Sequence, residues 1–249
     1  MEPEETILLQ ELECLEFLQD ISIALFFFSS MQVLQQSPKL QRFIRHLRVI
    51  SHFNSMPHVT LFSLLRKMQH LEVLSISISS SPSLVSDMKK ESPSHDSMYE
   101  CIPMSSKLTE HDYIVNLREL SLEGCGMFNL NWLTCAPSLQ LLRIYNCPSL
   151  EEVIDEEFGH AENVFLSLEI VDLDSLPNLR SICSQVLQFP CLKEIWVADC
   201  PRMLKLLFDS SSARSSLKHI NGQKNWWRNL KWEDEATRDL FHSKYVPFR

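Results

Sequence analysis

Apolar residues recur along this chain in a fixed phrase, in which a leucine or isoleucine is followed three and five positions later by two further apolar residues. In its fullest form the phrase is LxxLxLxxC, where x is mostly polar, and it occurs at residues 117–125, 139–147 and 192–200. Because successive side chains of a strand point to opposite faces, the fourth and sixth positions share one face and the fifth lies on the other. Each phrase therefore predicts a short strand with one buried face and one face toward solvent.

The phrase returns at regular intervals over most of the chain. It begins at Leu18, Ile44, Leu71, Leu117, Leu139, Leu168, Leu192 and Leu217. The intervals are 22 to 29 residues, except for one of 46 between Leu71 and Leu117. A period of roughly 20–29 residues is typical of leucine-rich repeats. Since one repeat cannot bury its leucines alone, we expect an α/β repeat, a leucine-rich-repeat solenoid with a short parallel strand per repeat.

The residues after each strand predict a turn. Cys125, Cys147 and Cys200 end their phrases, and Leu176 occupies the same place in the phrase that begins at Leu168. A small buried thiol suits a tight turn between stacked repeats. The last phrase is incomplete, because Gly222 stands where its third apolar residue belongs.

The repeat array is assigned to residues 1–222, with one interruption. Residues 79–111 are rich in Ser, Pro and Lys, a composition that does not build a packed repeat. We expect a loop insertion or a degenerate repeat there, and its serines are open to two interpretations, a loop without function and a phosphorylated segment. Residues 4–20 carry leucines at helical spacing, which predicts a helical N-terminal edge.

The C-terminal segment, residues 223–249, differs from the repeats. It holds three of the five tryptophans, Trp226, Trp227 and Trp232, followed by a charged stretch of helical character. The end of a stacked array needs a cap with a polar outer face. We therefore predict a Trp-rich C-terminal cap; an aromatic ligand cage is the alternative.

Composition and motifs argue against catalysis. With four glycines, the chain lacks a GxxxxGK[ST] phosphate loop and a dinucleotide loop, and it contains neither GxSxG nor HExxH. His46, His52 and His58 recur every six residues, which is not a metal-ligand spacing. We therefore expect no enzyme activity, no cofactor and no metal site.

Charge and targeting signals narrow the choice of partner and compartment. The net charge is −9, and Lys and Arg are scattered apart from Arg42, Arg45 and Arg48, which disfavours nucleic acid as a partner. The longest apolar run, residues 21–28, is too short to span a bilayer, and acidic residues replace the basic start of a secretory signal. None of the eight cysteines forms CxxC. These features predict a cytoplasmic protein with reduced thiols, protein partners and no transmembrane segment.

The outward strand positions are the candidate binding surface. From adjacent repeats we select six residues that we expect to form one concave patch: Arg143, Tyr145, Asp172, Asp174, Trp196 and Asp199. Aromatic residues and arginine are typical anchors of protein interfaces, so Tyr145 and Trp196 are the central candidates. The alternative is that neighbouring side chains cover both rings.

Two acidic features have a less specific interpretation. Asp172 and Asp174 could act as paired carboxylates, but they lie on an open strand surface with no histidine near them in sequence. The acidic run at residues 151–157 lies between two phrases. We interpret both as solvated polar surface, with the acidic run and the basic cluster near Arg45 as fallback binding sites.

Several longer segments carry a family resemblance. CPSLEEVI at 147–154, FPCLKEIWVADCPRMLKL at 189–206, NWWRNLKWEDEATRDLF at 225–241 and LQDISIAL at 18–25 resemble the C-terminal leucine-rich repeats of plant disease-resistance proteins of the coiled-coil, nucleotide-binding, leucine-rich-repeat class. The resemblance extends over nearly the whole chain except 79–111, and the tryptophan-rich ending is its most specific part.

The resemblance implies a function in plant defence. In that class the repeats sense a pathogen effector or a guarded host protein, and they hold a nucleotide-binding domain inactive. This sequence contains neither a nucleotide-binding module nor a coiled-coil domain. The implied function is therefore a recognition and autoinhibition module of an immune receptor, and the alternative is a free-standing repeat scaffold or adaptor.

Overall fold

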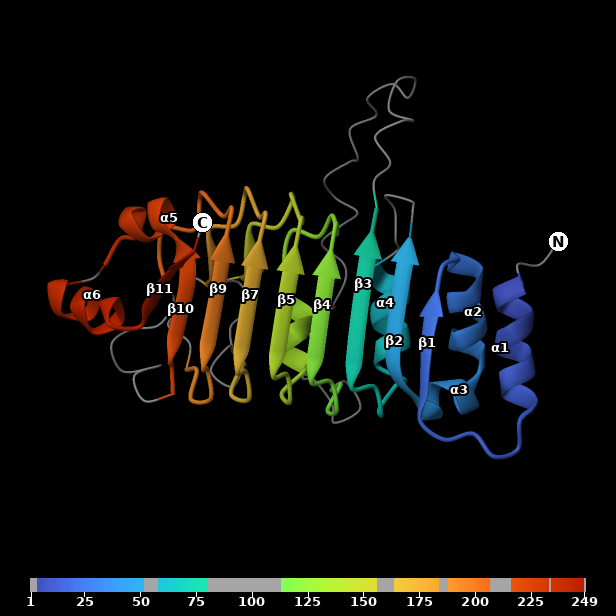
Figure 1. Cartoon of the computed structure of the whole chain (residues 1–249). Coiled ribbons are helices and arrows are strands. Elements are labelled where there is room, and N and C mark those ends of the chain that lie inside the picture. Colours follow the sequence, from blue (N-terminus) through green and yellow to red (C-terminus); the bar gives the residue numbers. More distant parts are fainter. Residues whose placement is uncertain are drawn as a thin grey trace, which may run out of the picture.

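The core of the protein is one long parallel sheet. The computed structural model describes residues 4–51, 58–79, 113–155, 164–183, 188–206, 216–232 and 234–248. The nine strands of this sheet lie in the order of the chain, with only β6 and β8 left out. They are β1 (Ile21–Leu25), β2 (Ile44–Ser51), β3 (Val73–Ile78), β4 (Glu119–Glu123), β5 (Leu141–Tyr145), β7 (Ile170–Asp174), β9 (Glu194–Ala198), β10 (His219–Gln223) and β11 (Tyr245–Phe248). Figure 1 shows the sheet running along the molecule between the helices of its N-terminal end and those of its C-terminal end.

Except for β11, the strands of the long sheet occur where the repeated phrase predicts them, which confirms the α/β repeat. In β4, β5, β7 and β9 the fourth and sixth positions of the phrase are at most 1% exposed: Leu120, Leu122, Leu142, Ile144, Val171, Leu173, Ile195 and Val197. Every neighbouring pair of strands is parallel, and equivalent residues of neighbouring repeats lie side by side in register. The interruption predicted at 79–111 lies outside the described residues apart from Ser79.

The first repeat has a different register from the one predicted. The phrase beginning at Leu18 places Ile21 and Ile23 on the buried face, but the partners of Leu47 and Val49 are Ile23 and Leu25. The partner of Ile21 is Ile44 and that of Ser22 is His46, so the extra residue of the bulge is Arg45 on β2. Ile21, Ile23 and Leu25 share one face of β1, where Ile21 and Ile23 are half-buried against the core and Leu25 is fully buried. The extra residue of a bulge cannot be seen in an apolar spacing alone.

A left-handed residue ends each strand in the middle of the array. Positive φ angles occur at Gly124, Asn146, Ser175 and Asp199, at equivalent places in four repeats, and also at Phe165, which precedes β7. The backbone N–H of Gly124, Asn146 and Ser175 donates to the last strand carbonyl of the following repeat at 3.0–3.1 Å. Only glycine fits at position 124, because a Cβ there would lie 2.0 Å from the Ile78 carbonyl oxygen. These turns therefore join neighbouring repeats through the backbone.

The cysteine that follows this turn is buried in every case. Cys125, Cys147 and Cys200 are almost fully enclosed, and each thiol donates to the carbonyl two residues earlier, at 3.6, 3.3 and 3.1 Å respectively. Burial raises the pKa of the Cys200 thiol to about 12. A thiol held protonated is a poor nucleophile, so Cys200 serves packing.

A second, smaller sheet follows the turns on the return path. β6 (Glu152–Ile154) and β8 (Ser181–Cys183) pair in parallel. Part of the acidic run at 151–157 therefore belongs to a strand, while residues 156 and 157 lie outside the described residues. Glu151 forms an ion pair with Arg180 at 3.1 Å. The remaining return segments include the helical elements α4 (His58–Leu65) and η4 (Asn131–Cys135), which lie behind the sheet in Figure 1.

Both ends of the array carry helices. At the N-terminal end α1 (Glu4–Cys14) packs on α2 (Phe28–Gln36) and α3 (Pro38–Phe43), as the helical spacing of residues 4–20 predicts. At the C-terminal end α5 (Lys224–Asn229) and α6 (Glu235–His242) precede β11. The sequence did not predict β11, which pairs with β10 and forms the edge of the sheet.

The C-terminal tryptophans pack against the last repeats. Trp226 and Trp227 are buried, and Trp232 packs against the core in a half-buried position. Trp226 Nε1 donates to the Met203 carbonyl at 3.0 Å. A Cβ at Gly222 would lie 2.5 Å from the Trp226 ring. The indole thus fills the space that the missing apolar side chain of the last phrase would occupy.

Candidate functional site

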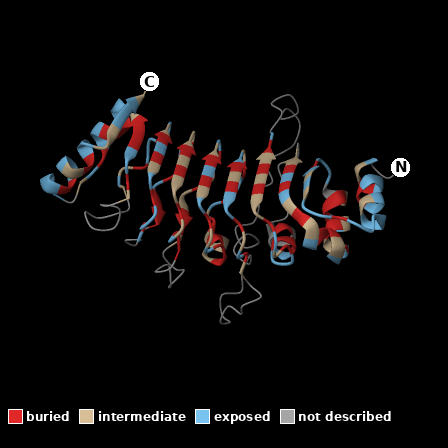
Figure 2. Ribbon diagram, turned by 60° about the horizontal axis from the view of Figure 1, so that its bottom comes forward, coloured by how far each residue is buried: buried red, intermediate tan, exposed pale blue. Residues whose placement is uncertain are grey.

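The outward face of the long sheet presents polar side chains in a regular arrangement. Figure 2 shows the strands following one another in an arc, with buried residues alternating with exposed or half-buried ones along each strand. Because the strands are parallel and in register, the outward residues of neighbouring repeats form continuous rows. The central row is Ala24, Arg48, Ser75, Ser121, Arg143, Asp172, Trp196 and Asn221.

The charge on this face changes along the array. On β2 and β3 the outward positions carry His46 and Arg48 with neutral neighbours. On β4, β5, β7 and β9 they carry five carboxylates, from Glu119, Glu123, Asp172, Asp174 and Glu194, and a single cation, from Arg143. The acidic part is therefore confined to the C-terminal half of the sheet.

The six residues predicted from the sequence lie close together on that half. Arg143, Asp172 and Trp196 are register partners on three successive strands, and Tyr145 and Asp174 form the next row. Asp199 follows β9 directly, in one of the left-handed turns. Sequence spacing was sufficient to place them, because each repeat contributes equivalent positions.

Hydrogen bonds hold the acidic side chains of this group in place. The Tyr145 hydroxyl donates to Asp172 Oδ2, across the two strands. Burial and the neighbouring Asp172 carboxylate both raise the pKa of Tyr145, so the phenol stays protonated as a donor. Asp174 Oδ1 accepts from Ser175 Oγ at 2.8 Å, and Asp199 Oδ1 accepts from Gln223 Nε2 at 2.9 Å.

The two aromatic candidates differ in exposure. Tyr145 is half-buried, whereas Trp196 is 39% exposed. Trp196 Nε1 donates to Glu194 Oε2 at 3.3 Å, and its ring centre lies 6.1 Å from that of Phe248 on β11. Neighbouring side chains therefore cover Tyr145 more than Trp196. The contact of Phe248 with Trp196 was not predicted, because β11 was not predicted from the sequence.

An open depression lies beside Trp196 at the C-terminal end of this face. Its lining residues are Asp199, Gln223, Lys224, Asn225, Pro247 and Phe248. It is formed by the turn after β9, the end of β10, the start of α5 and the end of β11. The candidate surface therefore continues past the last repeat onto the C-terminal segment.

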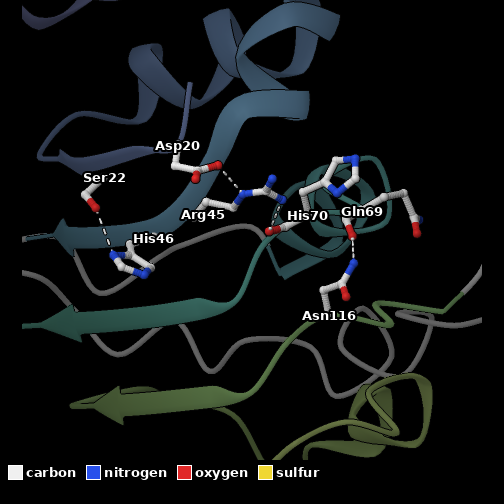
Figure 3. Close-up of polar contacts among 7 residues, drawn as sticks. All are labelled: Asp20, Ser22, Arg45, His46, Gln69, His70 and Asn116. Atoms are coloured by element: carbon white, nitrogen blue, oxygen red, sulfur yellow. Dashed lines mark hydrogen bonds and ion pairs between the residues drawn. The ribbon is translucent and has the colours of Figure 1, made fainter. Parts of the chain in front are cut away.

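Polar contacts of a different kind tie the first repeats together (Figure 3). Arg45 Nε forms an ion pair with Asp20 Oδ1 at 2.7 Å, and Arg45 Nη1 donates to the His70 carbonyl at 3.2 Å. Ser22 Oγ and His46 Nδ1 lie 2.8 Å apart. These side chains link β1 and β2 to the segment before β3.

The basic cluster predicted near Arg45 is consequently divided. Arg45 forms an ion pair with Asp20. The Cζ atom of Arg42 lies 5.8 Å from the centre of the Phe43 ring. Arg48 is exposed on the outward face. Farther along, Asn116 Nδ2 donates to the Gln69 carbonyl at 2.6 Å, a contact that joins the third repeat to the fourth (Figure 3).

Two further kinds of feature are a metal-binding group and a membrane-spanning helix. Among the residues the structure describes, no group of three or more His, Cys, Asp and Glu side chains is placed to hold a metal ion. No helix in the described ranges has both the length and the apolar character needed to cross a membrane. Of the three histidines spaced by six, His46 contacts Ser22, while His52 lies outside the described residues.

Comparison with known proteins gives the family. The model of the family described as "Plant disease resistance protein RPS2-like, leucine-rich repeats" matches residues 94–222. A protein of Arabidopsis thaliana described as a "probable disease resistance protein" is 31% identical over 243 residues, which are 96% of this chain and 26% of that protein. No solved structure matches.

Other relatives from the same plant match a little more than half of this chain. The disease resistance protein RPS5 is 35% identical over 51% of this chain and 15% of its own length. The disease resistance protein SUMM2 is 33% identical over 58% of this chain and 16% of its own length. The chain thus spans no more than about a quarter of these relatives' length. Its repeat pattern, its tryptophan-rich ending and these matches show that the chain belongs to the leucine-rich-repeat region of the plant disease-resistance proteins.

Proposed function

We propose that this chain is a protein-recognition and autoinhibition module of a plant immune receptor. The observation that supports this most strongly is the outward face of β5, β7 and β9, where Arg143, Asp172 and Trp196 lie side by side with no other element covering them among the described residues. An exposed tryptophan surrounded by charge is typical of a protein interface.

The architecture we propose is a solenoid closed at one end. Residues 1–222 form the repeat array, with 79–111 as an insertion or degenerate repeat, and residues 223–249 form a Trp-rich cap. The arc of strands in Figure 2 supports the first part. The burial of Trp226 and Trp227 against the last repeat supports the second.

The partners we propose are proteins. They are a pathogen effector, a guarded host protein, or the nucleotide-binding domain of a receptor, which this sequence itself does not contain. The module acts without catalysis or cofactor and in the cytoplasm, where the free thiols of its cysteines stay reduced.

Autoinhibition is tested by co-purification. The triple variant Arg143→Glu, Asp172→Arg, Trp196→Ala changes three neighbouring side chains on the outward face. We expect it to lose most of its binding to a nucleotide-binding domain from a related receptor, while its melting curve stays that of the unchanged chain.

A matched control carries equivalent changes elsewhere. Arg42→Glu, Glu13→Arg and Phe17→Ala reverse two exposed charges and remove one exposed ring at the N-terminal end. This control should bind as the unchanged chain does. If the outward-face variant bound equally well, the site would lie elsewhere; if no nucleotide-binding domain bound at all, the free-standing scaffold would be the better description.

A further inference from the structure

The carboxylates on the C-terminal half of the outward face are held by neutral donors. Glu123 accepts from Ser77 Oγ at 2.9 Å, Asp172 from Tyr145, Asp174 from Ser175 and Asp199 from Gln223. None of these donors carries a charge. A hydrogen bond from a hydroxyl or an amide orients a carboxylate without neutralising it.

Other carboxylates of the molecule form ion pairs with cationic side chains. Asp20 pairs with Arg45, Glu151 with Arg180, and Glu169 with Lys193. Within the described residues, no ion pair involves Glu123, Asp172, Asp174 or Asp199. The chain therefore pairs acids just before the strands and on the return path with cations, and it leaves these four outward carboxylates without an ion pair among the described residues.

Aromatic surface lies among the four carboxylates. Trp196 exposes 39% of its surface beside Asp172, its register partner, and Tyr145 lies between Glu123 and Asp174 in the adjoining row. An aromatic face attracts cations and also packs against the aliphatic stems of Lys and Arg. Trp196 and Tyr145 thus favour the same class of partner group as the carboxylates do.

We propose that this acidic–aromatic face, made of Glu123, Tyr145, Asp172, Asp174, Trp196 and Asp199, binds an extended polypeptide segment rich in arginine or lysine. The inference rests on the proposed recognition function and names the partner chemistry of that surface. The occupant is part of a protein partner, and it lies across the strands with its cationic side chains directed at the carboxylates.

The spacing of the carboxylates suits an extended chain. Glu123 and Asp174 lie in one row on strands separated by β5, so about 10 Å divides them at about 4.8 Å per strand. In an extended segment of polyproline II conformation, which has three residues per turn and a rise of about 3.1 Å per residue, residues three apart lie on the same side and about 9 Å apart. A cation at every third position therefore meets successive carboxylates.

The neighbouring row, just before the strands, has mixed charge. Its backbones follow one another across the repeats in the order Glu72, Arg118, Gln140, Glu169, Lys193 and Lys218, and Glu169 forms an ion pair with Lys193. This row therefore offers a basic segment no excess of negative charge. The occupant is thereby directed to the centres and ends of the strands, where Trp196 and the four carboxylates lie.

The test measures binding of a defined peptide by fluorescence anisotropy. The probe is a labelled peptide of about twelve residues with arginine at every third position and small neutral residues between, and its counterpart has glutamate in place of arginine. The full chain should bind the arginine peptide saturably and the glutamate peptide not at all. Binding should weaken as salt is raised, because exposed charges are screened.

Matched variants separate the face from the net charge. Glu123→Gln, Asp172→Asn and Asp174→Asn keep the shapes of the side chains, and should weaken binding about tenfold or more, about 1.4 kcal/mol. Glu11→Gln, Glu13→Gln and Glu16→Gln change the charge equally at the exposed N-terminal end and should leave affinity unchanged. Trp196→Ala should weaken binding as well, whereas Phe17→Ala, at a ring that is 92% exposed, should not.

Two results would overturn the inference. One is equal loss of binding in both neutralised triples, which would reduce the effect to overall charge. The other is the absence of saturable binding of the arginine peptide to a folded chain. If either occurred while the co-purifying receptor domain was still lost from the Arg143, Asp172 and Trp196 variant, the partner chemistry would be wrong and the proposed function would stand.

Discussion

At the scale of single residues, the inward positions of the repeat carry the stability of the fold. Leu142 lies on β5 with no exposed surface, between the register partners Leu120 and Val171. Leu142→Ala should lower the free energy of unfolding by about 2–5 kcal/mol, because it removes buried methyl groups and leaves a cavity. Urea denaturation followed by circular dichroism measures the change.

The neighbouring residue provides the control for this substitution. Leu141 precedes Leu142 on the same strand, points to the outward face and is half-buried. Leu141→Ala should therefore cost clearly less than Leu142→Ala. Equal losses at the two positions would mean that the assignment of buried and outward faces is wrong.

Gly222 illustrates a residue whose role only the structure explains. A Cβ at this position would lie 2.5 Å from a Trp226 ring that a hydrogen bond to the Met203 carbonyl holds in place. Gly222→Ala should lower the free energy of unfolding by about 1–3 kcal/mol through overpacking.

Gly126 offers a glycine in open surroundings for comparison. No atom lies within 4 Å of a Cβ built there, so Gly126→Ala should have little effect. Thermal denaturation of the two variants checks both expectations. A Gly222 variant as stable as the Gly126 variant would show that Trp226 can move aside.

Residue by residue, the apolar spacing was sufficient to predict which side chains are buried, because that spacing directly encodes the two faces of a strand. In β1 it placed Ile21 and Ile23 on the inward face, where both are half-buried against the core, but it did not identify Leu25, two residues farther on, which is fully buried. It showed that Gly222 stands where an apolar residue is expected. It could not show that the Trp226 ring occupies this space, because local spacing contains no information on contacts between elements.

At the scale of elements, the C-terminal segment is where sequence reasoning was least complete. The tryptophans and a helix were predicted, but β11 was not. Its sequence, Tyr245-Val246-Pro247-Phe248, contains a proline, which argues against a strand unless the strand lies at a sheet edge. β11 lies at such an edge. Pro247 there lacks an N–H to donate, which protects the edge from further strand pairing.

The start of α6 depends on a titratable cap. Asp234 Oδ1 accepts from the Thr237 backbone N–H at 2.6 Å, and this hydrogen bond lowers the pKa of the Asp234 carboxyl below its ordinary 3.8. Because the folded-state pKa is depressed, the stabilisation is present above about pH 4 and is lost as the pH falls through the folded value. Asp234→Ala should therefore lower the melting temperature at pH 7.

The pH dependence of this variant is the more specific readout. The difference in melting temperature between the unchanged chain and Asp234→Ala should shrink as the pH falls below about 4. Asp234→Asn retains an acceptor and should be close to the unchanged chain at pH 7. An Ala variant that melted like the unchanged chain at every pH would show that the cap contributes nothing to stability.

Deletion of residues 223–249 tests the whole C-terminal segment. The deletion removes Trp227, which stacks on Tyr245 at 4.2 Å between ring centres, and uncovers the apolar residues beneath it. The shortened chain should aggregate and melt at a lower temperature, because a large exposed apolar surface promotes association. Size-exclusion chromatography with light scattering measures this, and a monomer with unchanged melting would contradict the proposed cap.

At the scale of the whole molecule, the repeat explains why the candidate surface could be located but not fully described. Equivalent positions in successive repeats must lie in rows, so Arg143, Asp172 and Trp196 could be grouped from spacing alone. Their hydrogen-bond partners could not be predicted in the same way. Whether Asp174 meets Ser175 or a lysine depends on side-chain conformations and on the turn between repeats, which the spacing does not encode.

The last prediction concerns nucleotide binding by the whole chain. Relatives of this chain are about four to seven times as long as the region that it matches, and the 249 residues contain no glycine-rich phosphate loop. Phosphate binding requires clustered backbone N–H donors or concentrated positive charge, whereas the outward face has a carboxylate majority on its C-terminal half. We therefore expect the isolated chain neither to bind nor to hydrolyse ATP. Equilibrium dialysis with labelled ATP and magnesium should show no saturable binding to the folded chain, with a nucleotide-binding domain of a related receptor as positive control. Saturable binding that survives neutralisation of Arg48 and Arg143 by glutamine would contradict the proposal of a non-enzymatic recognition module, because it would require a phosphate site that neither exposed arginine supplies.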